Sequence, residues 1–503
     1  MPTLSVASIL SDSAKRRPDK VAIVQGERRV TYAQLWDSSL RVAGALAERG
    51  VGPGSRVALF APNVIEFVSG YYGVIAAGAT AVMISPLLTP AEGGEMVRRS
   101  GADLVLSHES VGQLAAAIAQ QGGASAILVS ELATYPDPLP TYVTRAPDDI
   151  AVLIFTSGTT GRPKAVMLSH LNLIMTVLNM AYDSDTPASS QDVVMGCLPL
   201  FHIFGQQASM NTPLRVGATM VLMPRFDAAA CLRSFNDEGV TVFAGVPTMF
   251  VQLLQAAARP GAPGIPLMKR VASGGAALPV AVLEQVEATF GAQITEGYGL
   301  SETSPGATSN QQVYGVRPGT VGHPSWGVEV EIADSAIEDR VELIPVGERG
   351  EVVVRGHCVF EGYLDDPEAT AAAIQDGWFR TGDIGVKDAD GFLSIVDRKK
   401  DLIIRGGFNI YPREVEEVLV THPDVQMAAV VGVPDAEYGE EIVAFVTLIA
   451  GSVSTADDIQ LFAREHLARY KYPRTVHVRE DLPLGPSMKI LRRELRRQAG
   501  ADS

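Results

Sequence analysis

The nine residues from Thr156 to Lys164 carry the groups that phosphate binding needs. Their sequence, Thr-Ser-Gly-Thr-Thr-Gly-Arg-Pro-Lys, follows the uncharged run Ala151–Phe155, which predicts a buried strand. Glycines let backbone N–H groups approach a polyphosphate, hydroxyls donate hydrogen bonds, and Arg162 and Lys164 carry positive charge. The common nucleotide-loop spacing G-x-x-x-x-G-K-[ST] does not occur. A flexible surface turn is the alternative, but we favour phosphate contacts from Thr156, Ser157, Gly158, Thr159, Thr160, Gly161 and Lys164.

The segment from residue 296 to residue 303, Glu-Gly-Tyr-Gly-Leu-Ser-Glu-Thr, combines an aromatic ring with a carboxylate. The glycines beside Tyr298 leave a flat surface on which its ring can meet a nucleobase. Glu302 can bind a hard cation such as Mg²⁺. Core packing of Tyr298, with Glu302 on a solvated helix, is the alternative for this segment alone.

Two further residues are candidates for polar chemistry. Asp383 ends the run Gly-Trp-Phe-Arg-Thr-Gly-Asp, where a carboxylate just after glycine can accept hydrogen bonds from both hydroxyls of a ribose. Lys489 lies in Pro483–Ile490, and an ammonium group there would stabilise negative charge that develops when a carboxylate reacts with a phosphate. A turn aspartate and a lysine of a basic tail are the plainer interpretations.

These segments resemble the motifs of the adenylate-forming superfamily, which holds acyl-CoA synthetases, aryl-CoA ligases, luciferases and the adenylation domains of peptide synthetases. Five motifs follow one another in family order, and the resemblance extends from about Ser11 to Leu495. It implies a large layered α/β domain, residues 1–397, and a small mobile α+β domain, residues 398–503. The dense charge cluster Asp397–Asp401 would form the hinge between them.

The resemblance also implies a role for each matching residue. Tyr298 would stack on adenine, within an ATP/AMP-binding segment that includes Glu296 and Gly297. Ser301 would contact the phosphate of the adenylate, and Glu302 would bind Mg²⁺. The remaining implied roles are ribose binding by Asp383, ribose and phosphate contact by Arg398, pivoting of the small domain about Lys400, and catalysis of adenylation by Lys489, with Ser301 and Glu302.

Two positions depart from the family pattern. Ser301 occupies a position where threonine is usual and serine is tolerated. Met488 stands where a glycine usually precedes the catalytic lysine. A side chain restricts φ where glycine would not, so the conformation of this loop is in doubt while the ammonium group is not.

Two segments resemble the walls of the acyl site in this family. The segment Leu198–Gly205 would line and gate the site, and the segment Ala272–Leu278 would form the other wall, where small residues leave room for a bulky or long acyl group. A lone histidine among apolar residues is more often packed than catalytic, so no acid–base role is expected for it. The pocket residues implied are His202, Ile203, Phe204, Gly274, Gly275 and Ala276.

The segment Arg405–Pro412 resembles the loop of the small domain that guides pantetheine during thioester formation. Gly406 and Gly407 would let a thin chain pass close to the backbone, and Phe408 follows them. A hairpin turn is the alternative for the two glycines.

The resemblance implies an ATP-dependent acid–CoA ligase with Mg²⁺, ATP and CoA. A medium- or long-chain fatty acid is the preferred substrate, and an aryl or polycyclic acid, as in coumarate ligases, is the second choice. An amino acid is disfavoured because no aspartate occurs between Leu198 and Thr212. An enzyme that loads an acyl-carrier protein and a catalytically silent acyl or nucleotide binder stay open as further interpretations, and so does assembly into a homodimer.

Composition agrees with an ordinary globular enzyme. A chain of 503 residues is too long for a single hydrophobic core, so two or more domains are expected. Of its residues, 47% are hydrophobic and 19% are charged. The net charge of −16 disfavours nucleic acid as a partner. Three widely spaced cysteines predict buried, reduced thiols and a cytoplasmic location. The uncharged stretch 67–91 predicts a buried helix, 68–77, followed by a core strand, 80–84, and not a transmembrane segment, and no secretory signal is expected.

Strands alternating with helices to about residue 300 predict α/β layers. Further core strands are expected at residues 57–60, 104–106, 126–129 and 219–222. A compact set after residue 412 would contain helices at 412–421 and 456–467, strands at 427–431 and 442–446, and a basic tail.

Overall fold

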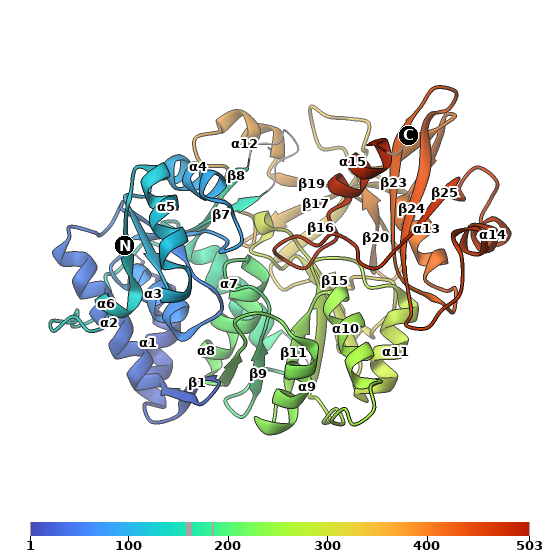
Figure 1. The fold of residues 1–503 in the computed structure, drawn as a ribbon. Coiled ribbons are helices and arrows are strands. Elements are labelled where there is room, and N and C mark those ends of the chain that lie inside the picture. Colours follow the sequence, from blue (N-terminus) through green and yellow to red (C-terminus); the bar gives the residue numbers. More distant parts are fainter. Residues whose placement is uncertain (1, 157–162, 184–185, 502–503) are drawn as a thin grey trace.

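A computed structural model describes residues 2–156, 163–183 and 186–501. Two mainly parallel sheets with helices around them make up most of the large N-terminal part (Figure 1). The first sheet has the order β6-β5-β3-β4-β7-β8, and β7 and β8 form an antiparallel hairpin. Its strands are β3 (Arg56–Phe60), β4 (Thr80–Met83), β5 (Leu104–Ser107), β6 (Ser125–Leu128), β7 (Ile150–Thr156) and β8 (Lys164–Ser169).

The second sheet has the order β15-β14-β13-β12-β11-β9-β10-β1-β2. Its central strands, from β13 to β1, pair in parallel, so their carboxyl ends share one edge. Ligands bind at such edges in α/β proteins. The strands are β1 (Val21–Gln25), β2 (Arg28–Thr31), β9 (Val193–Gly196), β10 (Thr219–Leu222), β11 (Val242–Gly245), β12 (Arg270–Gly274), β13 (Ile294–Tyr298), β14 (Thr308–Ser309) and β15 (His323–Pro324).

The helices of the large part pack against these sheets through a shared apolar core. A capping box at Thr31 begins α2, and another at Ser169 begins α7. The helices are α1 (Ala7–Arg16), α2 (Tyr32–Glu48), α3 (Ile65–Ala76), α4 (Pro90–Ser100), α5 (Gly112–Gly122), α6 (Val129–Leu132), α7 (His170–Tyr182), α8 (Thr212–Val216), α9 (Ala228–Asp237), α10 (Pro247–Ala257) and α11 (Val280–Phe290), with short helices η1 (Glu109–Val111), η2 (Gly205–Asn211), η3 (Ser301–Thr303) and η4 (Gln312–Tyr314).

A third, antiparallel sheet connects the large part to the rest of the chain. Its order is β16-β17-β19-β18, and β20 pairs with β19. The register of β19 and β20 places Asp383 directly opposite Arg398, so two predicted nucleotide ligands become neighbours. The elements are β16 (Val328–Ala333), β17 (Arg349–Gly356), α12 (Pro367–Ala373), β18 (Ile374–Gln375), β19 (Trp378–Lys387), β20 (Leu393–Arg398) and η5 (Lys399–Asp401).

The C-terminal residues form a smaller α+β unit with apolar cores of their own, coloured orange to red in Figure 1. It lies beside the carboxyl-end edge of the second sheet, so its last loop can reach that edge. The expected small domain is present, and its elements are β21 (Ile403–Arg405), β22 (Phe408–Ile410), α13 (Pro412–Leu419), β23 (Val425–Asp435), β24 (Gly439–Leu448), α14 (Ala456–His466), β25 (Thr475–Arg479) and α15 (Arg492–Ala501).

The elements confirm most sequence expectations and correct one. The stretch 67–91 forms the end of buried α3 and then β4, as predicted, and all three cysteines are buried. The strand expected at 126–129 is the half-exposed edge strand β6, and Val129 begins α6. The basic tail ends in helix α15, which packs Leu495 and Ala499 against the small sheet.

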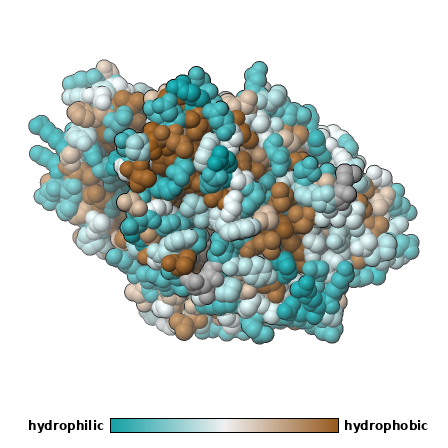
Figure 2. Space-filling model, turned by 180° about the vertical axis from the view of Figure 1, so that it is seen from behind, coloured by the Kyte–Doolittle hydropathy of each residue, from teal (hydrophilic) through white to brown (hydrophobic). Residues whose placement is uncertain are grey.

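The surface mixes hydrophilic and hydrophobic side chains. Figure 2 shows the back of the molecule, where hydrophilic residues cover most of the face and hydrophobic residues gather in separate areas between them. Among the described residues, no helix is long and apolar enough to cross a membrane.

Candidate active site

A continuous cavity of about 2420 Å³ lies where the large part meets the small unit. Its walls include the carboxyl ends of β11, β12 and β13, helix η3, the segment after β20 and the loop 485–489 of the small unit. The cavity therefore receives side chains from segments far apart in sequence.

The ends of the predicted phosphate loop both line this cavity. Thr156 closes β7 and Lys164 opens β8, and the two residues pair across the hairpin. The two ends of the predicted loop therefore meet at the wall of the cavity. The predicted contacts Ser157, Gly158, Thr159, Thr160 and Gly161 lie outside the described residues.

Glu302 is a buried carboxylate at one wall of the cavity. It is only 8% exposed, it lies in η3 beside Ser301, and the Tyr363 hydroxyl donates to its Oε1 at 3.0 Å. Burial raises the pKa of Glu302 above its usual range, and the Tyr363 hydrogen bond opposes this shift. The Lys164 ammonium lies 4.7 Å from the centre of the Tyr363 ring, so a cation also lies close to this ring. A carboxylate in this setting is suited to a bound metal cation.

Tyr298, Asp383 and Arg398 form one polar group in the cavity. The Tyr298 hydroxyl donates to Asp383 Oδ2 at 2.7 Å, and Arg398 Nε lies 3.5 Å from Asp383 Oδ1. Burial raises the pKa of Asp383, and Arg398 and Tyr298 oppose the shift. Gly297 precedes Tyr298 in β13 and also lines the cavity. Asp383 is therefore a fixed acceptor within a strand and not an aspartate of a surface turn.

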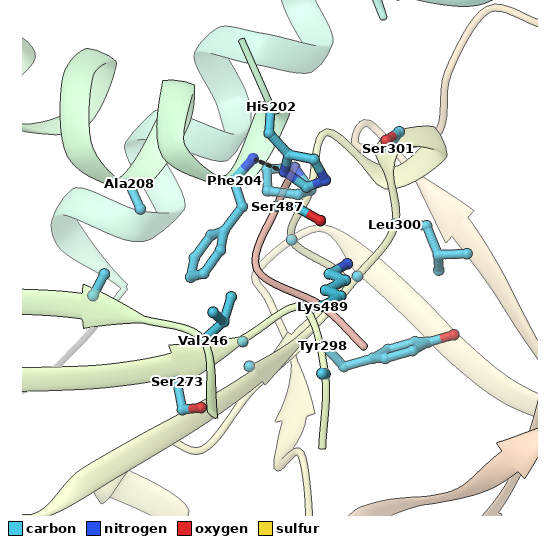
Figure 3. A pocket seen from close by; sticks show the side chains of 18 of the residues that line it. His202, Phe204, Ala208, Val246, Ser273, Tyr298, Leu300, Ser301, Ser487 and Lys489 are labelled. Atoms are coloured by element: carbon cyan, nitrogen blue, oxygen red, sulfur yellow. Dashed lines mark hydrogen bonds between the residues drawn. The ribbon is translucent and has the colours of Figure 1, made fainter. Parts of the chain in front are cut away.

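Lys489 enters the cavity from the small unit, and Figure 3 shows its side chain between Tyr298 and His202. Burial, together with the nearby Arg398 guanidinium and against the attraction of Asp383, lowers the pKa of Lys489 to about 8. Gly275 permits this approach, because a Cβ built on it would lie 3.1 Å from Lys489 Cε. The ammonium is thus surrounded by groups of the large part.

The structure shows the conformation of the loop in which Met488 replaces the usual glycine. Its φ is +62°, in the left-handed region that glycine adopts without strain. The Thr248 hydroxyl of α10 donates to the Met488 carbonyl oxygen at 2.7 Å, and the Met488 N–H donates to Gly485. The loop therefore keeps a glycine-like conformation despite its side chain, and a side chain of the large part holds it.

The acyl-side residues line the cavity next to Lys489. His202 and Phe204 lie on one wall and Gly274 and Ala276 on the other, and Figure 3 shows the Phe204 ring extending from the segment before η2 toward the strands. Burial, reinforced by Lys489, lowers the pKa of His202 to about 3, so its imidazole is neutral at physiological pH. Its Nδ1 accepts a hydrogen bond from the Phe204 N–H at 3.3 Å, which is a packing role.

Two predicted residues point away from the cavity. Ile203 is fully buried in the apolar core, because consecutive residues of a helical turn do not share a face. Glu296 is on the opposite face of β13 from Gly297, since side chains alternate along a strand, and its Oε1 accepts from the Leu278 N–H at 3.1 Å. Burial raises the pKa of Glu296 to about 7.

The predicted CoA-side residues lie apart from the cavity in this arrangement. Gly406 and Gly407, with φ of +56° and +83°, form the turn of the hairpin β21–β22, and Phe408 stacks on Tyr470 with ring centres 4.6 Å apart. Lys400 does line the cavity, next to Arg398. Thus the structure brings together most of the described residues predicted for adenylation and leaves Gly406, Gly407 and Phe408, predicted for thioester formation, outside the cavity.

Sequence reasoning missed Tyr363 and Thr248. Tyr363 reaches Glu302 only because its backbone pairs with Val166 of β8. Thr248 meets Met488 from 240 positions away in sequence. No local pattern signals either contact, because both arise from pairing between distant segments.

Comparisons with known proteins agree with this geometry. Two family descriptions match the chain, "AMP-binding enzyme" over residues 10–364 and "AMP-binding enzyme C-terminal domain" over residues 414–489. A long-chain-fatty-acid–CoA ligase of Bacillus subtilis is 37% identical, covering 98% of this chain and 94% of that protein. A feruloyl-CoA synthase of an Amycolatopsis species is 36% identical and covers 97% of each chain.

A solved protein that is similar in structure exists in two forms. The ATP-bound crystal structure of MatB from Rhodopseudomonas palustris is 30% identical and has a TM-score of 0.88, covering 98% of this chain and 99% of that chain. The apo crystal structure of the same protein, also 30% identical, has a TM-score of 0.77 with full coverage of both chains. The present arrangement is thus more similar to the ATP-bound form, and the chain belongs to the AMP-binding enzymes, the adenylate-forming superfamily of acyl-CoA synthetases that its motifs indicate.

Proposed function

We propose that the chain joins a medium- or long-chain fatty acid to CoA at the expense of ATP, through an acyl-adenylate. The observation that carries this proposal is the meeting of Lys489, Asp383 and Glu302 in one cavity that extends past the Phe204 ring, which lies against Gly274, into a channel along β11 and β12. Polar groups on one side suit a nucleotide, and small apolar residues on the other side suit a long acyl group.

In the first half-reaction, a carboxylate oxygen of the acid attacks the α-phosphorus of ATP. The bond from this phosphorus to the bridging oxygen breaks, and pyrophosphate leaves with the electron pair. Asp383 and Arg398 hold the ribose, Tyr298 stacks on adenine, and the ends of the phosphate loop, Thr156 and Lys164, position the phosphates. The Lys489 ammonium lies where negative charge grows on the α-phosphate and the carboxylate, and it stabilises that charge.

Glu302 fits the expected metal ion. Mg²⁺ is usually held by one or two carboxylates together with substrate phosphates, and Glu302 is a buried carboxylate beside the phosphate-loop strand. Mg²⁺ would neutralise phosphate charge there, while Ser301 donates to the phosphate of the adenylate. Tyr363 orients the carboxylate through its hydrogen bond to Oε1.

In the second half-reaction, the CoA sulfur attacks the acyl carbon, the thiol proton is lost, and AMP leaves. The small unit must first rotate about Lys400, because Gly407 and Phe408 now lie away from the cavity while Lys489 occupies it. The similarity to an ATP-bound relative supports the view that the present arrangement serves adenylation.

An aryl or polycyclic acid is the second candidate substrate, favoured by the small residues Gly274 and Gly275 at the mouth of the channel and by the feruloyl-CoA synthase relative. We also infer a cytoplasmic site of action from the three buried cysteines, which form no disulfide. Transfer to an acyl-carrier protein instead of CoA, and pairing of two copies, are secondary proposals.

The test is pyrophosphate release from MgATP with fatty, aryl and dicarboxylic acids, each with and without CoA. We expect release with one class of acid, and formation of AMP and a thioester only when CoA is present. A panel in which no acid supports release, although the protein binds ATP, would contradict the proposed function. Thioester formation with a carrier protein and not with CoA would replace the proposed acceptor.

A further inference from the structure

The floor of the acyl channel consists of three rows of residues on one face of the second sheet. Strand pairing places Gly274 beside Gly297 in the first row and Ala244, Ala272 and Thr295 side by side in the second. All of them line the cavity, and alternation along the strands places the rows on one face of the sheet. The first row is next to Lys489, and the second leads away from it.

The third row ends the channel with a charged residue. Val194, Val242 and Arg270 pair side by side across β9, β11 and β12, and all three line the same cavity. Arg270 and Gly274 stand at opposite ends of β12, which is about 13 Å at the usual rise per residue. The channel thus runs along the sheet face from the catalytic lysine to an arginine.

On the opposite wall, the Phe204 ring lies against the first row, since a Cβ built on Gly274 would be 3.2 Å from Phe204 Cζ. Phe204 lines the cavity from the segment before η2, Ala208 from η2 and Thr212 from the start of α8. Figure 3 shows Phe204 and Ala208 on the side of the pocket away from Ser301 and Tyr298. Beyond the Phe204 ring, Ala208 and Thr212 on this wall and Ala244 and Ala272 on the floor are small, and the cavity reaches Arg270.

Arg270 has an unused hydrogen-bond donor. Its Nη2 contacts Asp192 Oδ2 at 3.2 Å, but its Nε is buried and has no acceptor among the atoms that the structure describes. Asp192 is also contacted by Lys269 at 3.0 Å and accepts from the Ser189 N–H, so one carboxylate faces two cations. Burial lowers the pKa of Arg270, against the opposing effect of Asp192, which reflects a poorly solvated guanidinium.

A buried donor without an acceptor is costly, and a ligand oxygen would relieve that cost. We infer that the acid substrate carries a second oxygen function at its far end, a carboxylate or a neutral oxygen, that accepts a hydrogen bond from Arg270. The inference rests on the proposed function and narrows its substrate class. At about 1.2 Å per bond of an extended chain, roughly eight to fourteen carbons would span the channel.

The experiment compares matched acids that differ only at the far end. Pyrophosphate release is measured with unsubstituted, terminally hydroxylated and dicarboxylic acids of roughly eight to fourteen carbons, the lengths that the strand rise implies. We expect kcat/KM to be at least about tenfold higher for an oxygenated acid than for the plain acid of equal length, as for a gained hydrogen bond to a charged group. A greater gain for the dicarboxylic acid indicates a carboxylate, and a greater gain for the hydroxy acid indicates a neutral oxygen.

Two variants locate the effect. Arg270→Met removes the donor at similar volume, and it should abolish the preference while retaining activity on the plain acid. Lys269→Met is the control, since the Lys269 ammonium already contacts the Pro187 carbonyl and Asp192, and it should keep the preference. If Arg270→Met fails to fold, the comparison of acids on the unaltered enzyme stands by itself.

The inference is overturned if plain acids are used as well as oxygenated acids at every length, or if Arg270→Met keeps the preference. Release with plain acids would leave the proposed ligase function intact. No release with any acid would contradict the ligase function itself, so the two failures are distinguishable.

Discussion

The nucleotide side and the acyl side of the cavity are built in different ways. On the nucleotide side, polar side chains contact one another in defined pairs, such as Tyr298 with Asp383 and Tyr363 with Glu302. On the acyl side, rows of glycine, alanine and valine leave space, and a charged group appears only at Arg270 among the described residues of the three rows. Pairs of polar groups specify a reaction, whereas the size of an apolar channel specifies a range of substrates.

The contrast explains why the reaction class is evident before the acid is. In the proposed reaction, Asp383 and Lys489 each have a distinct electrostatic task, so their types and neighbours are restricted. The channel residues need only be small, and small residues also occur wherever elements pack closely. Each prediction below alters one side and asks whether the other side is unaffected.

The largest effect is expected for Lys489→Ala. Loss of the ammonium should lower the rate of acyl-adenylate formation by about 10²- to 10³-fold, as for removal of other groups that stabilise transition-state charge. Thioester formation from supplied acyl-adenylate should be nearly unchanged, because Lys489 must leave the cavity for that step. Lys399→Ala is the control, since Lys399 is a partly exposed lysine of the hinge segment itself and contacts Glu338 at 3.3 Å. Equal loss of both half-reactions would refute the division of labour.

A block in the acyl channel should separate acids by length. Ala272→Leu enlarges a side chain in the second row of the floor, between Gly274 and Arg270. Overpacking of this kind costs about 1–3 kcal/mol, so we expect activity on acids of about ten or more carbons to fall by about 10- to 100-fold. Activity on short acids such as acetate and butyrate and the KM for ATP should stay the same, and kinetics with both acid classes provide the check. An equal loss of activity on long and short acids would mean that the acyl group does not lie along the strands that carry Ala272.

Removal of Asp383, the proposed ribose acceptor, should affect the nucleotide side of the cavity and not the acyl side. Asp383→Ala deletes the partner of the Tyr298 hydroxyl and of Arg398, and we expect ATP affinity to fall by about tenfold or more, as for the loss of hydrogen bonds to a charged group. Calorimetric titration with ATP measures this directly. The order of preference among acids should not change, and unaltered ATP affinity would remove Asp383 from the ribose role.

The lowered pKa of Lys489 predicts an alkaline limit to adenylation. The ammonium is present below pH 8 and lost above it, so kcat/KM for adenylation should fall about tenfold per pH unit above roughly 8. Because the pKa of His202 is about 3, titration of its imidazole should not change the rate of adenylation near neutral pH. The pH dependence of the rate, measured separately for the two half-reactions, tests this prediction. If thioester formation shows the same loss of rate at alkaline pH, the loss belongs to a group other than Lys489.

The smallest effect is expected at Met488. Relief of its left-handed conformation by Met488→Gly is worth about 1 kcal/mol, so adenylation relative to thioester formation should rise by at most about fivefold. Thr248→Val should move the ratio in the opposite direction, because it removes the hydroxyl that donates to Met488. Thr248→Ser should restore the ratio, and changes of the same sign in Met488→Gly and Thr248→Val would contradict a positioning role.

Sequence patterns predicted the elements that form from neighbouring residues. They did not predict the direction in which individual side chains point. The strand that ends at Thr156 and helix α13 follow from short-range patterns. Ile203 and Glu296 were misplaced because a single position in a turn or strand reverses the direction of a side chain.

Long-range contacts account for the rest of what sequence could not provide. Strand register alone places Arg270 two rows from Gly274, and it also sets Asp383 opposite Arg398. The motif resemblance predicted which residues share a nucleotide site, but the row of Val194, Val242 and Arg270 has no motif. The nucleotide side of the cavity could therefore be predicted from motifs, whereas the acyl side could not.

The most direct test of the proposed reaction is a single-turnover experiment with the unaltered enzyme. Enzyme in excess is mixed with MgATP and an acid that supports pyrophosphate release, without CoA, and the quenched products are identified by mass spectrometry. We expect acyl-adenylate and pyrophosphate in equal amounts, followed on addition of CoA by AMP and the thioester as the adenylate disappears. Formation of ADP and phosphate, or of a thioester without a preceding adenylate, would contradict adenylation as the first step.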